Sequence, residues 1–212
     1  MSDVQLSLGG QPLFAPLSAS VAPGEVLSVT GPSGSGKSSL LAWACGVLAP
    51  PFAASGDLRL DGQSLLPLPT ERRRLGILFQ DALLFPHLSV GANVAFGLRA
   101  GSGSRAQRRR LVDDALASVG LAGFRERDPA TLSGGERVRV ALLRVLLAEP
   151  RAVLLDEPFS RLDAPLRESI RSLVFGRCRE RGLPVLLVTH DAADVAAAGG
   201  RELALRSGAD AR

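Results

Sequence analysis

The segment Gly31-Pro-Ser-Gly-Ser-Gly-Lys-Ser38 decides how the rest of this 212-residue chain is interpreted. It matches the pattern G-x-x-x-x-G-K-[ST] and lies where that pattern requires, between a β-prone run at residues 26–30 and a helical stretch that starts near Ser38. Its glycines let backbone N–H groups converge on phosphate oxygens, and the N-terminus of the following helix adds its dipole. The alternative is a glycine-rich helix cap without a ligand. The complete pattern in the required context favours a phosphate-binding loop.

The basic residues single out one position within this segment. Of the 25 Lys and Arg residues in the chain, Lys37 is the only lysine. An ammonium group is a compact point charge that can enter a tight phosphate cradle, whereas a guanidinium is a broad planar fork. Lys37 is therefore predicted to neutralise the β and γ phosphates of a nucleotide, and Ser38 to ligate Mg²⁺. The predicted nucleotide-binding residues of this segment are Gly31, Pro32, Ser33, Gly34, Ser35, Gly36, Lys37, Ser38 and Ser39.

Composition limits the remaining possibilities. The chain is 46% hydrophobic and 22% charged, which is typical of one globular domain and not of a disordered chain. Cys45 and Cys178 lie far apart without a metal-ligand cluster, so neither a disulfide framework nor a zinc site is predicted. The net charge of +4 is mild, and the arginine clusters at residues 72–74 and 108–110 are interpreted as solvated helix faces, not as a nucleic-acid surface. No export signal or membrane-spanning segment is predicted.

The apolar pattern predicts an α/β fold with a mainly parallel sheet. Continuous apolar runs at residues 26–30, 75–79, 152–155 and 184–189 are typical of strands buried on both faces. A crossover helix is expected over residues 167–181, between the last two of these strands.

Two other regions are expected beside this sheet. Short strands at residues 4–8, 18–21 and 56–61 are predicted to form a small antiparallel layer. Residues 105–119 and 137–147 carry apolar side chains at three- and four-residue spacing, which predicts helices within a helical insert.

A pair of carboxylates follows the strand predicted at residues 152–155. Asp156 and Glu157 stand at its carboxyl end, where a metal-binding carboxylate of a phosphate-binding fold belongs. Asp156 is predicted to orient Mg²⁺ and its water, and Glu157 to polarise the attacking water as a general base. Taken alone, an apolar strand that ends in Asp-Glu is also a common strand end. The phosphate-binding loop makes the functional interpretation the better one.

Further motifs give the chain a resemblance to a known family. Leu132-Ser-Gly-Gly-Glu136 resembles the signature motif of the ATP-binding subunits of ABC transporters. Gln80 matches the family's Q-loop, Ser160-Arg-Leu-Asp163 its D-loop, and His190 its switch histidine. The resemblance covers residues 4–206, and the motifs occur in the family's order.

The resemblance implies the ABC ATPase fold. A P-loop NTPase core with a mainly parallel sheet, a small antiparallel β layer and an inserted α-helical subdomain is expected. The chain would be one domain, residues 1–212, with a RecA-like core at residues 1–80 and 151–212 and a helical subdomain at about 81–150.

The resemblance also implies roles for the motif residues. The activity would be ATP hydrolysis with ATP and Mg²⁺, carried out by Glu157, His190 and Gln80, with Gln80 touching Mg²⁺ or the water. Two subunits, as a homodimer or paired with another ABC subunit, would associate head to tail with two nucleotides between them. The residues implied to act across that interface are Ser133, Gly134, Gly135 and Asp163.

Several of these residues have ordinary structural interpretations. Ser133 and Glu136 form the pattern of a helix capping box, although capping alone does not explain the two glycines between them. Glu136 replaces the commoner Gln of the family, for which we expect an altered rate and not a lost activity. His190 could be a polar strand cap.

Residues 81–90 resemble importer-type subunits, in particular the thiamine, iron, polyamine and sulfate class. In the family this region and the helical insert accept a coupling helix of the transmembrane subunit. Leu84, Phe85 and Leu88 are expected either to line that groove as exposed residues or to belong to the core of the insert. Leu8-Gly-Gly stands where the family usually has an adenine-stacking aromatic, so base recognition is expected from apolar contact or from Phe14.

The resemblance thus predicts an ATP-hydrolysing subunit that energises solute transport, most simply import, through separate transmembrane permease subunits. A separate solute-binding protein is a further expected partner, and nucleic acid is not. The subunit would lie in the cytoplasm, on the inner face of the membrane. The alternatives are a non-transport ABC ATPase acting on DNA or ribosomes, and a membrane-tethered regulator driven by ATP-dependent dimerisation. The interval between phosphate loop and signature is too short for the coiled coil of DNA-repair relatives, and the chain has one cassette where translation factors have two.

Overall fold

A five-stranded parallel sheet forms the centre of the computed structural model, which describes residues 1–205. Residues 206–212 lie outside the described residues. They include the end of the predicted domain, at residue 212, and the end of the family resemblance, at Arg206. The strand order is β10-β3-β9-β8-β7, and every neighbouring pair is parallel. The strands are β3 (Val26–Thr30), β7 (Leu75–Leu78), β8 (Ala152–Asp156), β9 (Val185–Val188) and β10 (Arg201–Ala204). The predicted parallel sheet is confirmed.

Alternate residues of the central strands enter two separate hydrophobic cores. Val153 and Leu155 of β8 pack into one core with helices on one face of the sheet. Leu154 of β8 and Leu186 of β9 pack into the other core. Successive side chains of a strand point to opposite faces, so a strand covered on both faces must be apolar at every position. The continuous apolar runs of the sequence follow from this double burial.

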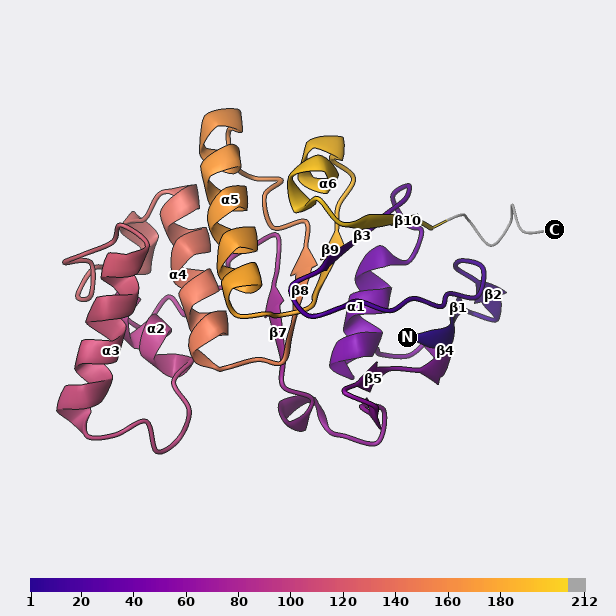
Figure 1. The fold of residues 1–212 in the computed structure, drawn as a ribbon, viewed down its shortest axis with the longest axis horizontal. Helices are drawn as coiled ribbons and strands as arrows, with labels where there is room; N and C mark the ends of the chain where they lie inside the picture. Colours follow the sequence, from indigo (N-terminus) through magenta and orange to yellow (C-terminus); the bar gives the residue numbers. More distant parts are fainter. Residues whose placement is uncertain (206–212) are drawn as a thin grey trace.

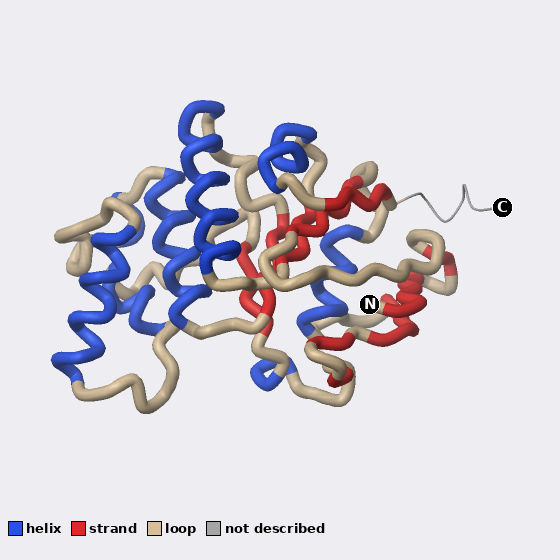
Figure 2. The backbone as a smooth tube through the Cα atoms, in the orientation of Figure 1, coloured by secondary structure: helices blue, strands red, loops and turns tan. Residues whose placement is uncertain are grey.

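Helices cover both faces of the sheet (Figure 1). One helix, α1 (Lys37–Cys45), packs in the same core as the antiparallel sheet, and two others, α5 (Ala164–Glu180) and α6 (Ala192–Ala198), contribute to the opposite core. Between β7 and β8 the chain forms α2 (Val90–Phe96), α3 (Arg105–Ser118) and α4 (Gly134–Leu147), which share a third core. Figure 2 shows these helices gathered at one end of the molecule and the antiparallel strands at the other. Single 3₁₀ turns occur at η1 (Thr70–Arg72) and η2 (Pro129–Thr131).

The antiparallel layer differs from its prediction in two strands. It consists of β2 (Gln11–Pro12), β1 (Ser2–Leu8) and β4 (Phe52–Asp57), in that order. Residues 18–21 are not a strand, because the pairing with β1 is limited to a bridge between Val4 and Leu17 and the Ser18 side chain bonds with Asp3 instead. The predicted strand 56–61 is divided, since β4 ends at Asp57 and a separate hairpin joins β5 (Arg59–Leu60) to β6 (Gln63–Ser64).

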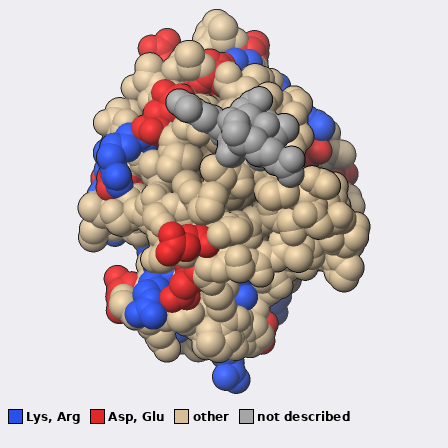
Figure 3. All heavy atoms as spheres, turned by 90° about the vertical axis from the view of Figure 1, so that its right-hand side faces the viewer, with Lys and Arg blue, Asp and Glu red and all other residues tan. Residues whose placement is uncertain are grey.

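The surface carries charges of both signs. Figure 3 shows the end of the molecule with the antiparallel sheet, where basic and acidic side chains lie in small mixed groups on a mostly uncharged face. No helix among the described residues is long and apolar enough to cross a membrane. Cys45 and Cys178 are both free and buried.

Arg73 is buried, which corrects the interpretation of residues 72–74 as a solvated face. Its Nη1 donates to the carbonyls of Trp43 and Ala44, at 3.0 and 2.7 Å, and its Nε donates to the carbonyl of Leu68 at 3.0 Å. The first two carbonyls belong to the last turn of α1, where helix carbonyls lack intrahelical N–H donors and the helix dipole favours a cation. Arg72 and Arg74 are exposed, as predicted.

Replacement of Arg73 should therefore destabilise the fold strongly. Arg73→Ala removes the donor to the carbonyls of Ala44 and Leu68, while the carbonyl of Trp43 keeps its bond from the Gly46 N–H, so we expect the free energy of unfolding to fall by about 2–4 kcal/mol. Arg72→Ala is the matched control and should change it by less than about 0.5 kcal/mol. Urea unfolding followed by circular dichroism measures both values. Equal effects of the two substitutions would show that the carbonyl contacts of Arg73 contribute little.

Candidate nucleotide-binding site

The carboxyl ends of four parallel strands meet at one edge of the sheet. In the strand register Val29 of β3 lies beside Val188 of β9, and Val188 lies beside Asp156 of β8. Leu78 of β7 lies beside Leu155. Gly31 directly follows β3 and Glu157 directly follows β8, while His190 and Gln80 lie two residues after the ends of β9 and β7. Ligands of open α/β sheets bind at this edge, so the topology gathers the predicted residues there.

The loop of residues 31–36 has a backbone that only glycine fits easily. Gly31, Gly34 and Gly36 have φ angles of 148°, 79° and 90°. A Cβ at Gly31 would lie 2.9 Å from the carbonyl oxygen of Leu205, so that position also lacks space for a side chain. Gly36 is the N-cap of α1, and no side chain caps the helix. The first N–H groups of α1 are therefore left for a ligand, as an anion-binding helix N-terminus requires.

Lys37 is folded over this loop. Its Nζ donates to the carbonyls of Gly31 and Pro32, at 2.9 and 2.8 Å, and the residue is 7% exposed. A single ammonium group thus reaches across the loop from its helix side. The buried hydroxyl of Ser35 has no hydrogen-bond partner within residues 1–205. Both features fit a loop built around an anionic group.

Two oxygen ligands stand together beside the loop. The Ser38 hydroxyl donates to Oδ1 of Asp156 at 3.1 Å, which joins the start of α1 to the end of β8. Burial raises the pKa of the Asp156 carboxyl, and the nearby Glu157 charge adds to this, while the Ser38 hydrogen bond and Lys37 act in the opposite direction. A hydroxyl and a carboxylate are hard oxygen donors, which Mg²⁺ prefers. The residues present therefore fit Mg²⁺.

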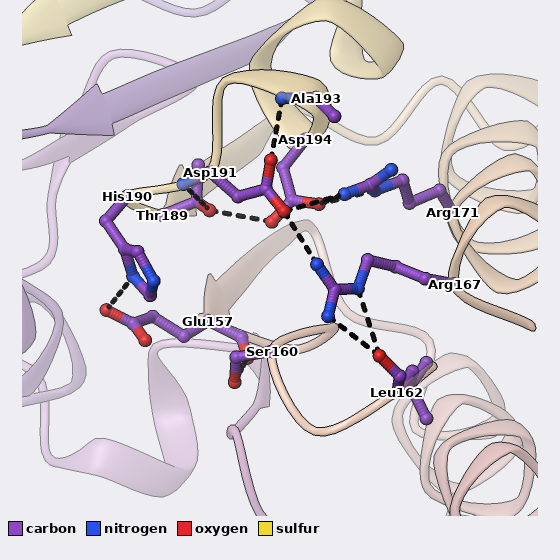
Figure 4. Close-up of polar contacts among 10 residues, drawn as sticks. All are labelled: Glu157, Ser160, Leu162, Arg167, Arg171, Thr189, His190, Asp191, Ala193 and Asp194. Atoms are coloured by element: carbon purple, nitrogen blue, oxygen red, sulfur yellow. Dashed lines mark hydrogen bonds and ion pairs between the residues drawn. The ribbon is translucent and has the colours of Figure 1, made fainter. Parts of the chain in front are cut away.

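Glu157 and His190 contact each other directly (Figure 4). Nδ1 of His190 lies 3.1 Å from Oε1 of Glu157. The backbone of Glu157 has a φ of 46°, a left-handed conformation that costs energy in a residue with a side chain. Its N–H donates to the carbonyl of Val188, and its carbonyl accepts the Ser160 hydroxyl at 2.9 Å. Strain that is held by surrounding bonds in this way is typical of functional positions.

The predicted signature residues lie at the N-terminus of α4, with Ser133 as the N-cap of the helix. Ser133 and Glu136 form the capping box: the Ser133 side chain accepts from the Glu136 N–H, and the Glu136 carboxylate accepts from the Ser133 N–H at 2.7 Å. These bonds to Ser133 lower the pKa of Glu136. Ser133 and Gly134 are exposed. The structure thus leaves the N-terminus of α4 open to solvent.

Gly135 has a structural explanation that the sequence did not supply. It is buried, and a Cβ there would lie 2.6 Å from the side chain of Leu166. A glycine at this position lets α4 approach α5 closely. The two glycines between Ser133 and Glu136, which capping does not explain, thus differ: the second also has a packing role against Leu166 within the chain.

The remaining motif residues lie in loops next to the sheet edge. Gln80 is exposed, just beyond the end of β7. The adjacent Asp81 forms an exposed ion pair with Arg161, which joins the segment after Gln80 to the loop after Glu157. Asp163 ends that loop as the N-cap of α5, where its carboxylate accepts from the Leu166 N–H at 3.0 Å.

The apolar residues that are exposed after Gln80 are not the ones that the sequence predicted. Leu84, Phe85 and Leu88 are half-buried, and Leu84 packs against two of the cores. The exposed side chains of this region are Leu83 at 57% and Phe96 at 66%. Phe85 packs against Phe96 with ring centroids 4.7 Å apart and the ring planes tilted by 58°. The sequence missed Leu83 and Phe96, since exposure here depends on how α2 packs.

Phe14 cannot stack on a base from its present position. It is 1% exposed and belongs to the core beneath α1. Leu13 is half-buried, and its side chain lies against the position that a Cβ of Gly36 would take. Leu13 and Phe14 both lie beside Gly36 of the phosphate-binding loop, but the burial of Phe14 makes the expectation that it recognises the base wrong.

Comparisons with known proteins agree with this geometry. The family model described as ABC transporter matches residues 14–160. An uncharacterized ABC transporter ATP-binding protein, YnjD of Escherichia coli, is 50% identical over 93% of this chain and 90% of its own length. The thiamine import ATP-binding protein ThiQ of Vibrio parahaemolyticus is 44% identical over 84% of this chain and 75% of its own length.

A solved structure is similar over nearly the whole chain. It is the dimeric post-hydrolysis state of the ATP-binding cassette MJ0796 bound to ADP and Pi, with a TM-score of 0.79, 30% identity, and coverage of 97% of this chain and 95% of that one. The fold, the family match and these identities together show that the chain belongs to the ABC transporter family, as an ATP-binding subunit with ATPase activity.

Proposed function

We propose that this chain energises the import of a solute by hydrolysing ATP on the inner face of a membrane, through separate transmembrane permease subunits. The observation that carries the proposal is the convergence of Lys37, Asp156, Glu157 and His190 on one edge of the sheet, with Glu157 and His190 3.1 Å apart. Import in particular is supported by the relative named for thiamine import. A separate solute-binding protein would complete such a system.

ATP would bind with its phosphates on the loop of residues 31–39. The uncapped N–H groups of α1 and the Lys37 ammonium would face the phosphate oxygens, which they stabilise by charge and by hydrogen bonds. In that state Lys37 exchanges the carbonyls of Gly31 and Pro32 for phosphate. Ser38, Asp156 and Gln80 would hold Mg²⁺, which when bound offsets the negative charge of the phosphates.

Glu157 is the proposed general base. Its carboxylate would accept a proton from the water that attacks the γ phosphorus, and ADP would leave. His190 would keep the carboxylate in place through Nδ1 and would contact the γ phosphate with the rest of its ring. Positioning matters here because phosphoryl transfer gains most of its rate from orientation and electrostatics.

A second subunit is proposed to complete each site. Ser133 and Gly134 are exposed at the N-terminus of α4, where helix N–H groups and dipole favour a phosphate. Within one chain they are not beside the phosphate-binding loop, so a head-to-tail pair would supply them to each other's nucleotide, together with Gly135 and Asp163. The dimeric state of the similar ATP-binding cassette supports this arrangement.

The permease is proposed to dock beside the segment after Gln80. A groove there is lined by apolar and charged residues, namely Asp81, Ala82, Leu83, Leu84, Pro86, Pro129, Ala130 and Arg137. Leu83 and Phe96 leave exposed apolar area in the same region. Such area would be covered by a short helix of the transmembrane subunit.

Loss of the single lysine should abolish nucleotide binding. Lys37→Ala removes the only ammonium group of the loop, and we expect ATP hydrolysis to fall by at least about 100-fold. Lys37→Arg should not restore it, because the planar fork does not fit a loop sized for an ammonium. Binding of a fluorescent ATP analogue and release of phosphate measure the two effects. Hydrolysis at the original rate in either variant would refute the role of Lys37.

Removal of the general base should trap a nucleotide-bound dimer. Glu157→Gln keeps the size of the side chain but cannot accept the proton, so ATP should persist between two subunits. Size-exclusion chromatography with ATP and Mg²⁺ is expected to show a dimer for this variant. Glu168→Gln, an exposed position on α5, is the control and should behave as the original protein. A Glu157→Gln protein that stays monomeric would contradict the proposed dimer.

The charge of Asp156 should lower the stability of the nucleotide-free protein. Its pKa is raised above 3.8, so ionisation at neutral pH is less favourable in the folded than in the unfolded chain. Asp156→Asn should raise the thermal midpoint by a few degrees at pH 7 while it abolishes Mg²⁺-dependent hydrolysis. The gain should shrink as the pH falls through the folded-state pKa and vanish below about 3.8.

Asp114→Asn provides the matched control for this experiment, because Asp114 is exposed on α3. It should leave both the thermal midpoint and hydrolysis unchanged. A lower midpoint for Asp156→Asn at pH 7 would mean that the carboxylate stabilises the fold.

A further inference from the structure

Charged side chains connect the loop after Glu157 to the loop that carries His190 (Figure 4). The first loop, residues 158–163, ends at Asp163. The second, residues 189–191, ends at Asp191, the N-cap of α6. Arg167 of α5 reaches both loops, and Arg171 of the same helix reaches Asp191 of the second loop.

Arg167 contacts both loops with one guanidinium group. Its Nε and Nη2 donate to the carbonyl of Leu162, at 3.2 and 2.7 Å, and its Nη1 donates to Oδ2 of Asp191 at 2.7 Å. Leu162 directly precedes Asp163, and Asp191 directly follows His190. The planar fork of arginine suits such a bridge, because its donors point in fixed and different directions.

A buried ion pair also holds the second loop, residues 189–191, in place. Arg171 pairs with Asp194, and their side chains are 10% and 3% exposed. The Thr189 hydroxyl donates to Oδ2 of Asp194 at 2.7 Å and accepts from the Asp191 N–H at 3.1 Å. Oδ2 of Asp191, which accepts from Arg167, also accepts from Nη2 of Arg171 at 3.2 Å. Linked, charge-assisted hydrogen bonds of this kind restrict the groups that they join, so Asp191 has a defined position.

His190 depends on this backbone for its own position. Its side chain is 64% exposed, and its contact with Glu157 is made by a ring that other side chains cover little. A shift of residues 189–191 would therefore move the ring relative to the carboxylate. Arg167 bonds to both Leu162 and Asp191, so it joins this backbone to the first loop.

We propose that Arg167 is a positioning residue. Through it, the position of His190 relative to Glu157 depends on the position of the loop at residues 158–163. This inference rests on the proposed function, in which His190 and Glu157 act in hydrolysis and Asp163 faces a second subunit. Closure of a dimer against that loop would then be conveyed to His190 through the guanidinium of Arg167. ATP binding itself would not require it, since the hydrogen bonds of Arg167 within residues 1–205 go to Leu162 and Asp191 and not to residues 31–39.

Steady-state ATP hydrolysis by variants of the full chain tests the proposal. Arg167→Ala should lower kcat by about 10-fold or more and change the KM for ATP by less than about threefold. Arg167→Lys should recover part of kcat, because one ammonium can reach Asp191 or Leu162 but lacks the fixed fork. Arg177→Ala removes an arginine and an ion pair from the same helix, and it should retain the original kcat.

A double-mutant cycle separates positioning from general destabilisation. If Arg167 acts through His190, Arg167→Ala combined with His190→Ala should be no slower than His190→Ala alone. Losses that multiply in the double variant, or an unchanged kcat in Arg167→Ala, would overturn the proposal. Thermal unfolding identifies a variant that does not fold, and Arg167→Lys then takes its place in the cycle under the same criteria.

The control for the underlying function is the original chain against Glu157→Gln. If the original chain hydrolyses ATP and the Glu157 variant does not, a normal kcat in Arg167→Ala counts against Arg167 alone. If neither hydrolyses ATP, the proposed function and the inference that rests on it both fail.

Discussion

The parallel register of the central sheet is the constraint on which the site depends. Because β3, β9, β8 and β7 run in the same direction, the residues after each strand emerge at one edge. The residues thus gathered are far apart in sequence, from Gly31 to His190. A single antiparallel strand among these four would send one of them to the opposite edge. The burial of both sheet faces holds the register, since a shift by one residue would exchange the two cores.

Several residues at this edge of the sheet have conformations or environments that lower the stability of the fold. Gly36 leaves α1 without a side-chain cap, Glu157 has a left-handed backbone, and burial disfavours the charge of Asp156. Each feature would be corrected by selection for stability alone. Each instead suits a bound triphosphate, since free N–H groups attract phosphate and an ionised Asp156 can ligate a cation. The structure around the site supplies the stability that these positions lack.

Predictions from the sequence were correct where an element depends on residues close to it in the chain, and they failed where it depends on distant residues. The phosphate-binding loop, the strand before Asp156 and the capping box at Ser133 depend on neighbours within a few residues, and the structure has all three elements where they were expected. The burial of Arg73 and of Phe14 depends on partners from distant segments. No local pattern distinguishes Arg73 from Arg72 beside it. Likewise, packing of Gly135 against Leu166 requires knowledge of how α4 meets α5.

The unequal use of Arg and Lys has a physical explanation in these contacts. Arginines repeatedly join distant segments through backbone carbonyls: Arg144 donates to Ala82 and Leu83, and Arg139 donates to Val119. A long side chain with several fixed donors can satisfy carbonyls that no N–H reaches. The phosphate-binding loop instead needs a compact charged group whose donors can turn from carbonyl oxygens to phosphate oxygens. Lys37 suits that need because its three donors rotate about one atom: the group bonds the carbonyls of Gly31 and Pro32, and in the proposed function it would turn to phosphate oxygens.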